Sequence, residues 1–224
     1  MDVAAAQGNF TLALAELGYR MVWNDLRDEL VGYVEMKYER GEVDFQSGNV
    51  FDLGYKGEFD AVLITEIIEH VAHPDRFLSK IGEMVKPGGY VVMTTPNGAH
   101  FMNKLPKFAE CEDPERFEKI QFQPNGDGHI FLLWPDEIED LAERAGLEMD
   151  RLSLFTTPWA NGRHKTELML RFVPKSWVLK VERLMELLPE GIKARLMIHS
   201  ATRFRRREHG QHVESCVDGD GKLL

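Results

Sequence analysis

Residues 59–71 read FDAVLITEIIEHV, and the first seven of them are largely apolar. Runs of this kind are typical of central strands in parallel sheets, because both faces of such a strand are buried. A helical pattern follows over residues 74–85 and is closed by the sequence KPGG at 86–89. A further apolar run at 90–95 completes a strand, a helix and a second strand, which predicts a parallel βαβ unit.

The same alternation of strands and helices extends toward the N-terminus. Apolar runs at 1–4, 19–23 and 43–46 predict three shorter strands, and helical patterns at 10–18 and 26–38 separate them. This order predicts a sheet whose strands are mostly parallel and whose two faces are covered by helices.

The second half of the chain is less regular. Residues 96–128 carry several prolines and glycines without clear periodicity, and we expect an inserted lid or substrate loop there. A helix is predicted over 135–145, and an antiparallel pair of last strands is expected at 147–155 and 166–173. The chain therefore predicts an α/β domain over residues 1–173 with a seven-stranded, mostly parallel sheet.

Helical patterns continue beyond this domain. They cover residues 175–188 and 192–206, which predicts a helical appendage over 174–208. The last residues, 209–224, contain few apolar side chains, and we expect a disordered tail.

The predicted appendage is basic, although the whole chain carries a formal net charge of −10. Residues 171–208 contain ten Lys or Arg and four acidic residues, and the densest part holds Arg203, Arg205, Arg206 and Arg207. One interpretation is contact with an anionic membrane or with RNA through these arginines. The other is a helix that packs on the sheet and keeps a solvated basic face.

Composition limits the class of protein. The chain has 224 residues, 43% of them hydrophobic, and its acidity argues against a protein that coats nucleic acid without specificity. No apolar run is long enough to span a membrane, and the first residues do not read as a secretory signal. Cys111 and Cys216 do not form a disulfide framework. We therefore expect a cytoplasmic protein, peripheral to the membrane if the basic segment contacts lipid.

Small or polar residues follow each of the first three predicted strands. DVAAAQG at residues 2–8 would form a turn that a ligand can approach closely, Asp25 would accept hydrogen bonds from ribose hydroxyls, and residues 49–52 would meet an adenine ring. Each group alone is also compatible with a plain turn, a solvated acid or a helix cap. Because the carboxyl ends of parallel strands share one edge of the sheet, their order predicts a nucleoside site there.

These motifs resemble those of the class I S-adenosylmethionine-dependent methyltransferases over about residues 1–155. DVAAAQG resembles the first motif of the family, Asp25 the second, GNVFD the third, FDAVLITEIIEHV the fourth and MVKPGGYVVMTTPN the fifth. The resemblance implies a Rossmann-like sheet and S-adenosyl-L-methionine as cofactor. The cofactor-binding residues that it implies are Asp2, Ala4, Gly8, Asp25, Leu26, Asn49, Val50, Phe51, Asp52 and Thr65.

The first motif departs from the family pattern. Ala4 and Ala6 stand where glycine is usual, so that of these glycines only Gly8 is kept, and an alanine methyl would crowd the methionine carboxylate. The nearest alternative enzyme is a nicotinamide dehydrogenase, whose GxGxxG turn holds a pyrophosphate at a helix N-terminus. Residues 4–9 read AAAQGN and lack two of those glycines, which argues against it.

Glu66, Glu69 and His70 follow the strand with which residues 59–71 begin. If a helical turn starts at Glu66, their spacing places both carboxylates and the imidazole on one face, and His129 would return over the same edge of the sheet. Such a set suits Mg, Mn, Fe or Zn, and an ion would lower the pKa of a bound hydroxyl. Without a metal, Glu69, His70 and His129 are the candidate catalytic residues, with a histidine as base.

The same pattern carries a second resemblance. Glu66-x-x-Glu69-His70 with a later His129 resembles the metal-binding pattern of the small-RNA 3′-terminal 2′-O-methyltransferases and of the ubiquinone-biosynthesis O-methyltransferases. It implies that Glu66, Glu69, His70 and His129 bind a divalent metal, whereas other members of the class use a Glu-His pair to orient a loop or as a base.

We therefore expect a methyltransferase that acts on an oxygen of a small-molecule or lipid-linked acceptor. One alternative is methylation of the 2′ oxygen at an RNA 3′ end. The other is a non-catalytic nucleoside-binding module of the same fold, which the altered turn at residues 2–8 suggests.

Overall fold

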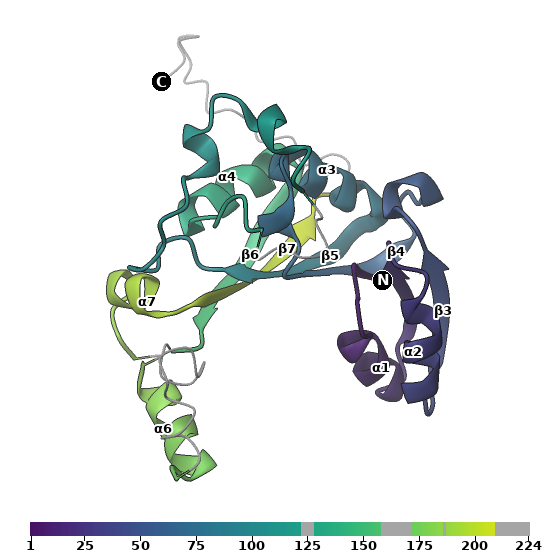
Figure 1. Cartoon of the computed structure of the whole chain (residues 1–224), viewed down its shortest axis with the longest axis horizontal. Coiled ribbons are helices and arrows are strands. Elements are labelled where there is room, and N and C mark those ends of the chain that lie inside the picture. Colours follow the sequence, from purple (N-terminus) through teal and green to yellow (C-terminus); the bar gives the residue numbers. More distant parts are fainter. Residues whose placement is uncertain (122–127, 158–171, 186, 209–224) are drawn as a thin grey trace.

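The computed structural model describes residues 1–121, 128–157, 172–185 and 187–208 (Figure 1). Within them, one seven-stranded sheet has the order β3-β2-β1-β4-β5-β7-β6, and only β7 runs antiparallel to its neighbours. The predicted α/β class and mostly parallel sheet are confirmed. The strands are β1 (Asp2–Val3), β2 (Arg20–Asp25), β3 (Glu42–Ser47), β4 (Phe59–Thr65), β5 (Val85–Pro96), β6 (Leu147–Phe155) and β7 (His199–Arg206).

Helices lie on both faces of the sheet, as predicted. The described helices are α1 (Asn9–Glu16), α2 (Leu30–Lys37), α3 (Pro74–Met84), α4 (Pro135–Arg144), α6 (Lys175–Met185) and α7 (Glu190–Leu196), and the 3₁₀ turns are η1 (Val50–Leu53), η2 (Ile68–His70), η3 (Phe108–Glu110) and η4 (Pro114–Phe117). α3 and α4 lie on one side of the sheet, and α1 and α2 lie on the other (Figure 1). Right-handed crossovers place the two pairs of helices on opposite faces. The chain moves along the sheet in one direction from β1 through β2 to β3, and in the other direction from β4 to β5. No helix of the described residues is both long and apolar enough to cross a membrane.

Helix α3 forms one side of the larger core. It begins at Pro74, whose fixed φ suits the first helical turn, and its apolar side chains recur on one face. Phe77, Leu78 and Ile81 of that face are buried in one cluster with Ile64 of β4. Full burial of such a side chain contributes about 1.5–3 kcal/mol to the free energy of unfolding. This packing therefore determines which face of β4 lies against α3.

The smaller core lies on the other face. Leu12 of α1, Trp23 of β2 and Val34 of α2 are buried together there. The indole of Trp23 donates a hydrogen bond to the carbonyl of Ala6 at 3.1 Å, so that this core also holds the loop after β1.

The C-terminal part of the sheet corrects the sequence prediction. A single helix is expected over 192–206, but α7 ends at Leu196 and β7 begins at His199. Phe204 is fully buried between exposed Arg203 and Arg205, which is the period of two of a strand. The helix prediction is wrong there because β5 and β6 each offer a backbone edge, which β7 fills on both sides.

The predicted appendage is therefore helical only in part. Over residues 174–208 it contains α6 and α7, and then it enters the sheet as β7. The predicted strand at 166–173 lies outside the described residues except for its last two, which are not in a strand. The tail predicted as disordered, 209–224, lies outside them as well. The inserted segment predicted at 96–128 connects β5 to α4 and, where it is described, carries η3 and η4.

The two central strands, β1 and β4, position the functional site. They pair in parallel, and the chain leaves β1 toward β2 but leaves β4 toward β5. Because the two connections diverge, neither covers the carboxyl ends of β1 and β4. Open α/β sheets bind their ligands at such a point.

Replacing Phe204 tests whether residues 199–206 form an internal strand. Phe204 is fully buried in the larger core, so we expect Phe204→Ala to lower the free energy of unfolding by about 3–5 kcal/mol. The control is Leu17→Ala at a side chain that is 75% exposed, which should change it by less than about 0.5 kcal/mol. Urea denaturation followed by circular dichroism measures both, and equal effects would contradict the packing of β7.

Candidate functional site

A cavity of about 890 Å³ opens at the carboxyl ends of β1, β2 and β4. Its volume is within the range of small-molecule sites, about 300–1,000 Å³. Most of the residues predicted to bind the cofactor line it, namely Ala4, Asp25, Leu26, Asn49, Val50, Phe51 and Thr65. The fold thus brings together the ends of strands that are separated in the sequence.

The remaining three predicted cofactor residues do not line this cavity. Asp2 is buried and accepts a hydrogen bond from the hydroxyl of Thr11 at 2.6 Å, and burial raises the pKa of Asp2. Gly8 precedes α1 with φ of 69°, and a Cβ at this position would lie 2.6 Å from the side chain of Val34. Asp52 is exposed on η1. Cofactor contacts by Asp2, Gly8 and Asp52 therefore stay predictions.

The loop after β1 has a glycine-like backbone at two alanines. Ala4 and Ala6 have φ of 53° and 44°, in the left-handed region, which costs an alanine about 1–2 kcal/mol. The N–H of Ala6 donates to Oδ2 of Asp25 at 2.9 Å, while its carbonyl accepts from Trp23. These hydrogen bonds hold the loop in the shape that glycines would adopt without strain.

Asp25 is buried at the end of β2, and both of its carboxylate oxygens already accept hydrogen bonds. Arg27 donates from Nε to Oδ1 at 2.8 Å and from Nη2 to Oδ2 at 3.1 Å. Burial acts to raise the pKa of Asp25, but hydrogen bonds from Arg27 and Ala6 outweigh it, so that this pKa lies below its usual value. Ribose hydroxyls bound here would therefore compete with the guanidinium of Arg27.

Several cavity residues are not marked by the sequence pattern. The amide of Asn24 donates to the carbonyls of Gln46 and Gly48, which joins the ends of β2 and β3. Phe77 of α3 meets the ring of Phe51 edge-on, with centroids 5.6 Å apart. A polar residue at a strand end could have indicated Asn24, but no local signal places Phe77 beside residues of another βα unit. Asn9, Phe10 and Arg27 also lie outside the quoted motifs, whereas Val3, Ala5, Ala6, Gln7, Gly48 and Ile67 lie within them but are not among the residues that the resemblance implies.

The turn after β4 also differs from the sequence prediction. Glu66 has φ of 52°, and its N–H continues the strand pairing by donating to the carbonyl of Thr94 at 2.9 Å. The 3₁₀ turn η2 begins only at Ile68, and Ile67 and Ile68 are both buried in the larger core. The left-handed residue therefore ends the strand, and no helical turn starts at Glu66.

The predicted common face of Glu66, Glu69 and His70 is wrong for this reason. Glu66 still lines the cavity, but its Oε2 lies 3.9 Å from Nε2 of His199. Glu69 and His70 lie in η2 and meet His129 instead.

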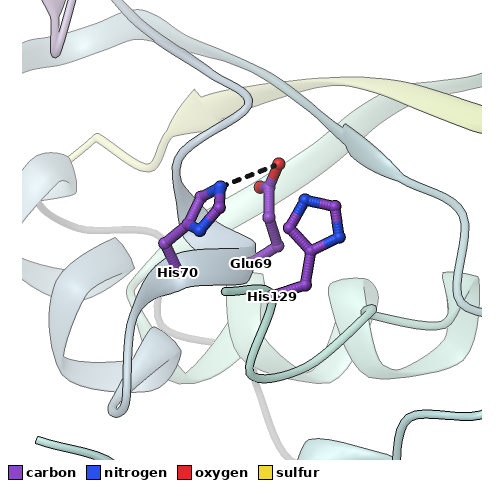
Figure 2. A group of neighbouring side chains, drawn as sticks. All are labelled: Glu69, His70 and His129. Carbon is purple, nitrogen blue, oxygen red and sulfur yellow. Dashed lines mark ion pairs between the residues drawn. The ribbon is translucent and has the colours of Figure 1, made fainter. Parts of the chain in front are cut away.

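Glu69, His70 and His129 form a compact cluster (Figure 2). One ligand atom from each lies within 4.8 Å of the others, and Nε2 of His70 is 4.0 Å from Oε1 of Glu69. The rings of His70 and His129 have centroids 4.9 Å apart. The backbone N–H of Ile130 donates to the carbonyl of Glu69 at 2.7 Å, which brings His129 to η2 from a distant part of the sequence. His70 also lines the cavity, so the cluster borders it.

The carboxylate of Glu69 is buried in this cluster. Its Oε2 accepts a hydrogen bond from the hydroxyl of Thr95 at 3.0 Å, whereas Oε1 is buried without a hydrogen-bond partner among the described residues. Burial raises the pKa of Glu69 to about 8, and the nearby charge of Glu66 adds to this rise. A buried oxygen beside two imidazoles suits either proton transfer or cation binding.

His199, at the start of β7, is a site residue that the sequence did not indicate. Its ring stacks on Phe155, with centroids 5.6 Å apart and planes 28° apart, and its Nε2 faces Glu66. Its position follows from the antiparallel pairing that places it opposite Pro96 of β5. Because the sequence predicts a helix over residues 192–206, it could not indicate that His199 lies beside Phe155 and Glu66.

Comparison with known proteins decides the family. A family model described as "Methyltransferase domain" matches residues 1–152, which is more than half of the chain. The chain belongs to this family. It is a class I S-adenosylmethionine-dependent methyltransferase, and its cofactor is S-adenosylmethionine.

Curated relatives agree with this family. A ubiquinone biosynthesis O-methyltransferase of Cereibacter sphaeroides (strain ATCC 17025) is 29% identical over 184 residues, covering 79% of this chain and 72% of that protein. Another, of Rhizobium etli (strain CIAT 652), is 30% identical over 167 residues, covering 72% of this chain and 64% of that protein.

Solved structures share the fold at low identity. An S-adenosylmethionine dependent methyltransferase from Mesorhizobium loti has a TM-score of 0.59 at 12% identity, covering 92% of this chain and 89% of that one. A SAM dependent methyltransferase from Archaeoglobus fulgidus has a TM-score of 0.58 at 15% identity, covering 91% and 84%. Family membership supports an enzyme over the alternative of a non-catalytic nucleoside-binding module.

Two substitutions test the strained loop of the methyltransferase. Ala4→Gly and Ala6→Gly each remove a methyl group from a left-handed residue, and we expect each to raise the free energy of unfolding by about 1 kcal/mol. The control is Ala13→Gly on the exposed side of α1, where the same change should lower it by about 1 kcal/mol. Urea unfolding measures all three, and loop variants as destabilised as the control would contradict the left-handed backbone.

A second test uses the titration of Glu69 in metal-free protein. Its folded-state pKa of about 8 lies above the ordinary 4.5, so the folded protein holds this proton more tightly than the unfolded chain does. Protonated Glu69 therefore makes its full contribution to the free energy of unfolding below about pH 4.5. This contribution is lost as the pH rises toward 8, by at most about 1.4 kcal/mol per pH unit.

The substitution Glu69→Gln removes this titration. In the presence of a chelator, we expect the free energy of unfolding of the wild type to fall relative to that of the variant between about pH 5 and pH 8. Urea denaturation at several pH values measures the difference. A constant difference across this range would mean that Glu69 has no raised pKa.

Proposed function

We propose that the methyltransferase transfers the methyl group to a phenolic hydroxyl of a small or lipid-linked acceptor. The observation that carries the proposal is the position of His70, which both lines the nucleoside cavity and belongs to the cluster with Glu69 and His129. A methyl donor in the cavity would thus lie beside groups that accept a proton. An oxygen acceptor needs such groups, because a neutral hydroxyl is a weak nucleophile.

The reaction is an in-line displacement. The bond between the sulfonium sulfur and the methyl carbon breaks while the acceptor oxygen bonds to that carbon, and S-adenosylhomocysteine leaves. His70 or His129 takes the hydroxyl proton, since a nitrogen of a neutral imidazole can accept one. Glu69, whose Oε1 lies 4.0 Å from Nε2 of His70, stabilises the imidazolium that forms when its own carboxyl group is ionised. This ionised form becomes more abundant as the pH rises toward the raised pKa of Glu69, about 8. Most of the acceleration comes from holding the two reactants in line away from water.

The cluster also fits a divalent metal ion. Oε1 of Glu69 is a buried oxygen without a hydrogen-bond partner among the described residues, and nitrogens of His70 and His129 lie near it. This mixture of oxygen and nitrogen suits Mg, Mn, Fe or Zn, and a bound ion supplies a Lewis acid that lowers the pKa of the acceptor hydroxyl. We propose these three residues as ligands, because Glu66 faces His199 and lies outside the group.

The relatives support an oxygen acceptor. The proteins matched over most of this chain are called ubiquinone biosynthesis O-methyltransferases, at 29% and 30% identity. That the acceptor of this chain belongs to the same biosynthesis is our proposal, and it agrees with the lipid-linked acceptor expected from the sequence.

Methylation of RNA is supported less well. The arginines that would contact RNA lie on or directly after β7, where Arg203 pairs with Asp150 and Arg205 with Glu208. Arg206 donates to backbone carbonyls. Side chains that already contact the protein offer less to a phosphate backbone, so RNA contact stays a prediction that a steep loss of binding with salt would support.

Cofactor titration and a methyl-transfer assay test the proposed reaction. We expect saturable calorimetric binding of S-adenosylhomocysteine, and we expect His129→Ala to lower kcat on a catechol by about 100-fold or more. The control is His73→Ala, because His73 lies near the same turn but pairs with Glu118 at 3.0 Å. Saturable cofactor binding without methylation of any phenol or catechol would overturn the proposed acceptor class.

Metal content tests the ligand set separately. We expect purified protein dialysed against Mn²⁺ or Zn²⁺ to retain about one ion per chain, as the one cluster of three ligands among the described residues implies. His129→Ala should lose this ion and His73→Ala should keep it, measured by elemental analysis. Equal metal content in wild type and His129→Ala would rule out the set.

A further inference from the structure

Helix α6 presents apolar side chains to solvent. Trp177, Val181 and Leu184 are 65%, 47% and 65% exposed, and their spacing of four and then three residues places them along one side of the helix. We call these three residues the α6 stripe. No side chain of α6 is fully buried, so within the described residues the stripe is not covered as a core-facing side would be.

A neighbouring side of α6, about 100° around the helix from the stripe, is attached to the protein. The carboxylate of Glu182 accepts hydrogen bonds from the backbone N–H and the hydroxyl of Thr157, which is buried just beyond β6. Val178 and Met185 on the neighbouring positions are half-buried. This attachment fixes the rotation of the helix and turns the α6 stripe outward. Figure 1 shows α6 projecting away from the sheet.

Positive charge lies next to the α6 stripe. Lys180 and Arg183 are exposed on the same helix, and α7 carries the exposed Arg195, whereas Lys193 of α7 is mostly buried and pairs with Glu190. Residues 171–208 are basic in a chain whose net charge is −10. An apolar stripe that includes Trp and is flanked by Lys and Arg is typical of helices that lie in the surface of an anionic bilayer.

The helix also lies at the edge of the sheet that carries the chemistry. Strand β6 runs parallel to β5, because both are antiparallel to β7, so β6 ends at the edge where β4 and β5 end. There Phe155 stacks on His199, which faces the cavity residue Glu66. The side chain of Asn97 donates to the carbonyls of Ala194 and Met197 and thereby fastens the end of α7 to the end of β5.

We propose that α6 docks the methyltransferase on an anionic lipid bilayer, with the α6 stripe inserted at the level of the headgroups. A bilayer bound there lies at the edge of the sheet that carries Glu66 and His199, and it would supply an acceptor that is linked to lipid. The choice of acceptor rests on the proposed function, whereas the bilayer contact does not require methyl transfer.

Vesicle co-sedimentation of the full chain tests the docking. We expect binding to vesicles of phosphatidylglycerol and phosphatidylcholine, weaker binding at high salt, and little binding to phosphatidylcholine alone. Val181→Asp/Leu184→Asp should weaken the binding by about tenfold or more, and Lys180→Glu/Arg183→Glu should do the same. Fluorescence of Trp177 should shift to shorter wavelength in the wild type when anionic vesicles are added.

Matched controls separate docking from general effects. Leu17→Asp/Met36→Asp introduces the same charges at side chains that are 75% and 80% exposed near α1 and α2 and should leave vesicle binding unchanged. Arg40→Glu/Lys56→Glu is the control for Lys180→Glu/Arg183→Glu. It reverses two charges at exposed positions outside α6 and α7 and should also leave vesicle binding unchanged. All variants should bind S-adenosylhomocysteine and methylate a water-soluble catechol like the wild type.

The outcomes distinguish this inference from the proposed function. Methylation of the soluble catechol without binding to anionic vesicles overturns the docking alone, and vesicle binding without methylation overturns the acceptor class alone. Binding that Val181→Asp/Leu184→Asp does not weaken also overturns the docking. A wild-type dimer that this variant dissociates in sedimentation velocity would assign the stripe to a second copy of the chain instead.

Discussion

The parallel pairing of β1 with β4 is the constraint on which the rest of the structure depends. Because the chain leaves these two strands in opposite directions, their carboxyl ends stay uncovered while their backbone groups remain paired in the sheet. The nucleoside cavity, the loop with Ala4 and the turn with Glu66 all occupy this opening. A different order of the strands would scatter the same residues.

Several unfavourable features of the structure lie at the same opening. Ala4, Ala6 and Glu66 have left-handed backbones, and Glu69 is a carboxylate buried with one unpartnered oxygen among the described residues. Such features persist only where neighbouring groups hold them, here through Asp25, Trp23 and Thr95 among others. Their cost agrees with a site that is shaped for a ligand and for proton transfer.

The segment between β6 and β7 links the catalytic edge to the molecular surface. It enters from Thr157, carries α6 and α7, and returns as β7 with His199 at its start. Because β7 fills the edges of both β5 and β6, and Asn97 holds the end of α7, the last part of this segment lies at the end of β5. His199, which follows α7, faces the cavity residue Glu66, so the described end of this segment adjoins the cavity.

The sequence by itself indicated the alternation of strands and helices up to residue 155, most of the cavity residues predicted at the strand ends and the return of His129 to the edge that carries Glu69 and His70. These depend on local periodicity and on the rule that parallel strands end at one edge. Only the tertiary structure decided that residues 199–206 are a strand, that Glu66 turns to His199 and that Arg27 occupies the carboxylate of Asp25. The physical reason is that unpaired strand edges and buried charged groups must pair with groups that the fold brings near them. Those groups are distant in the sequence, so the spacing of residues along the chain does not reveal the pairs.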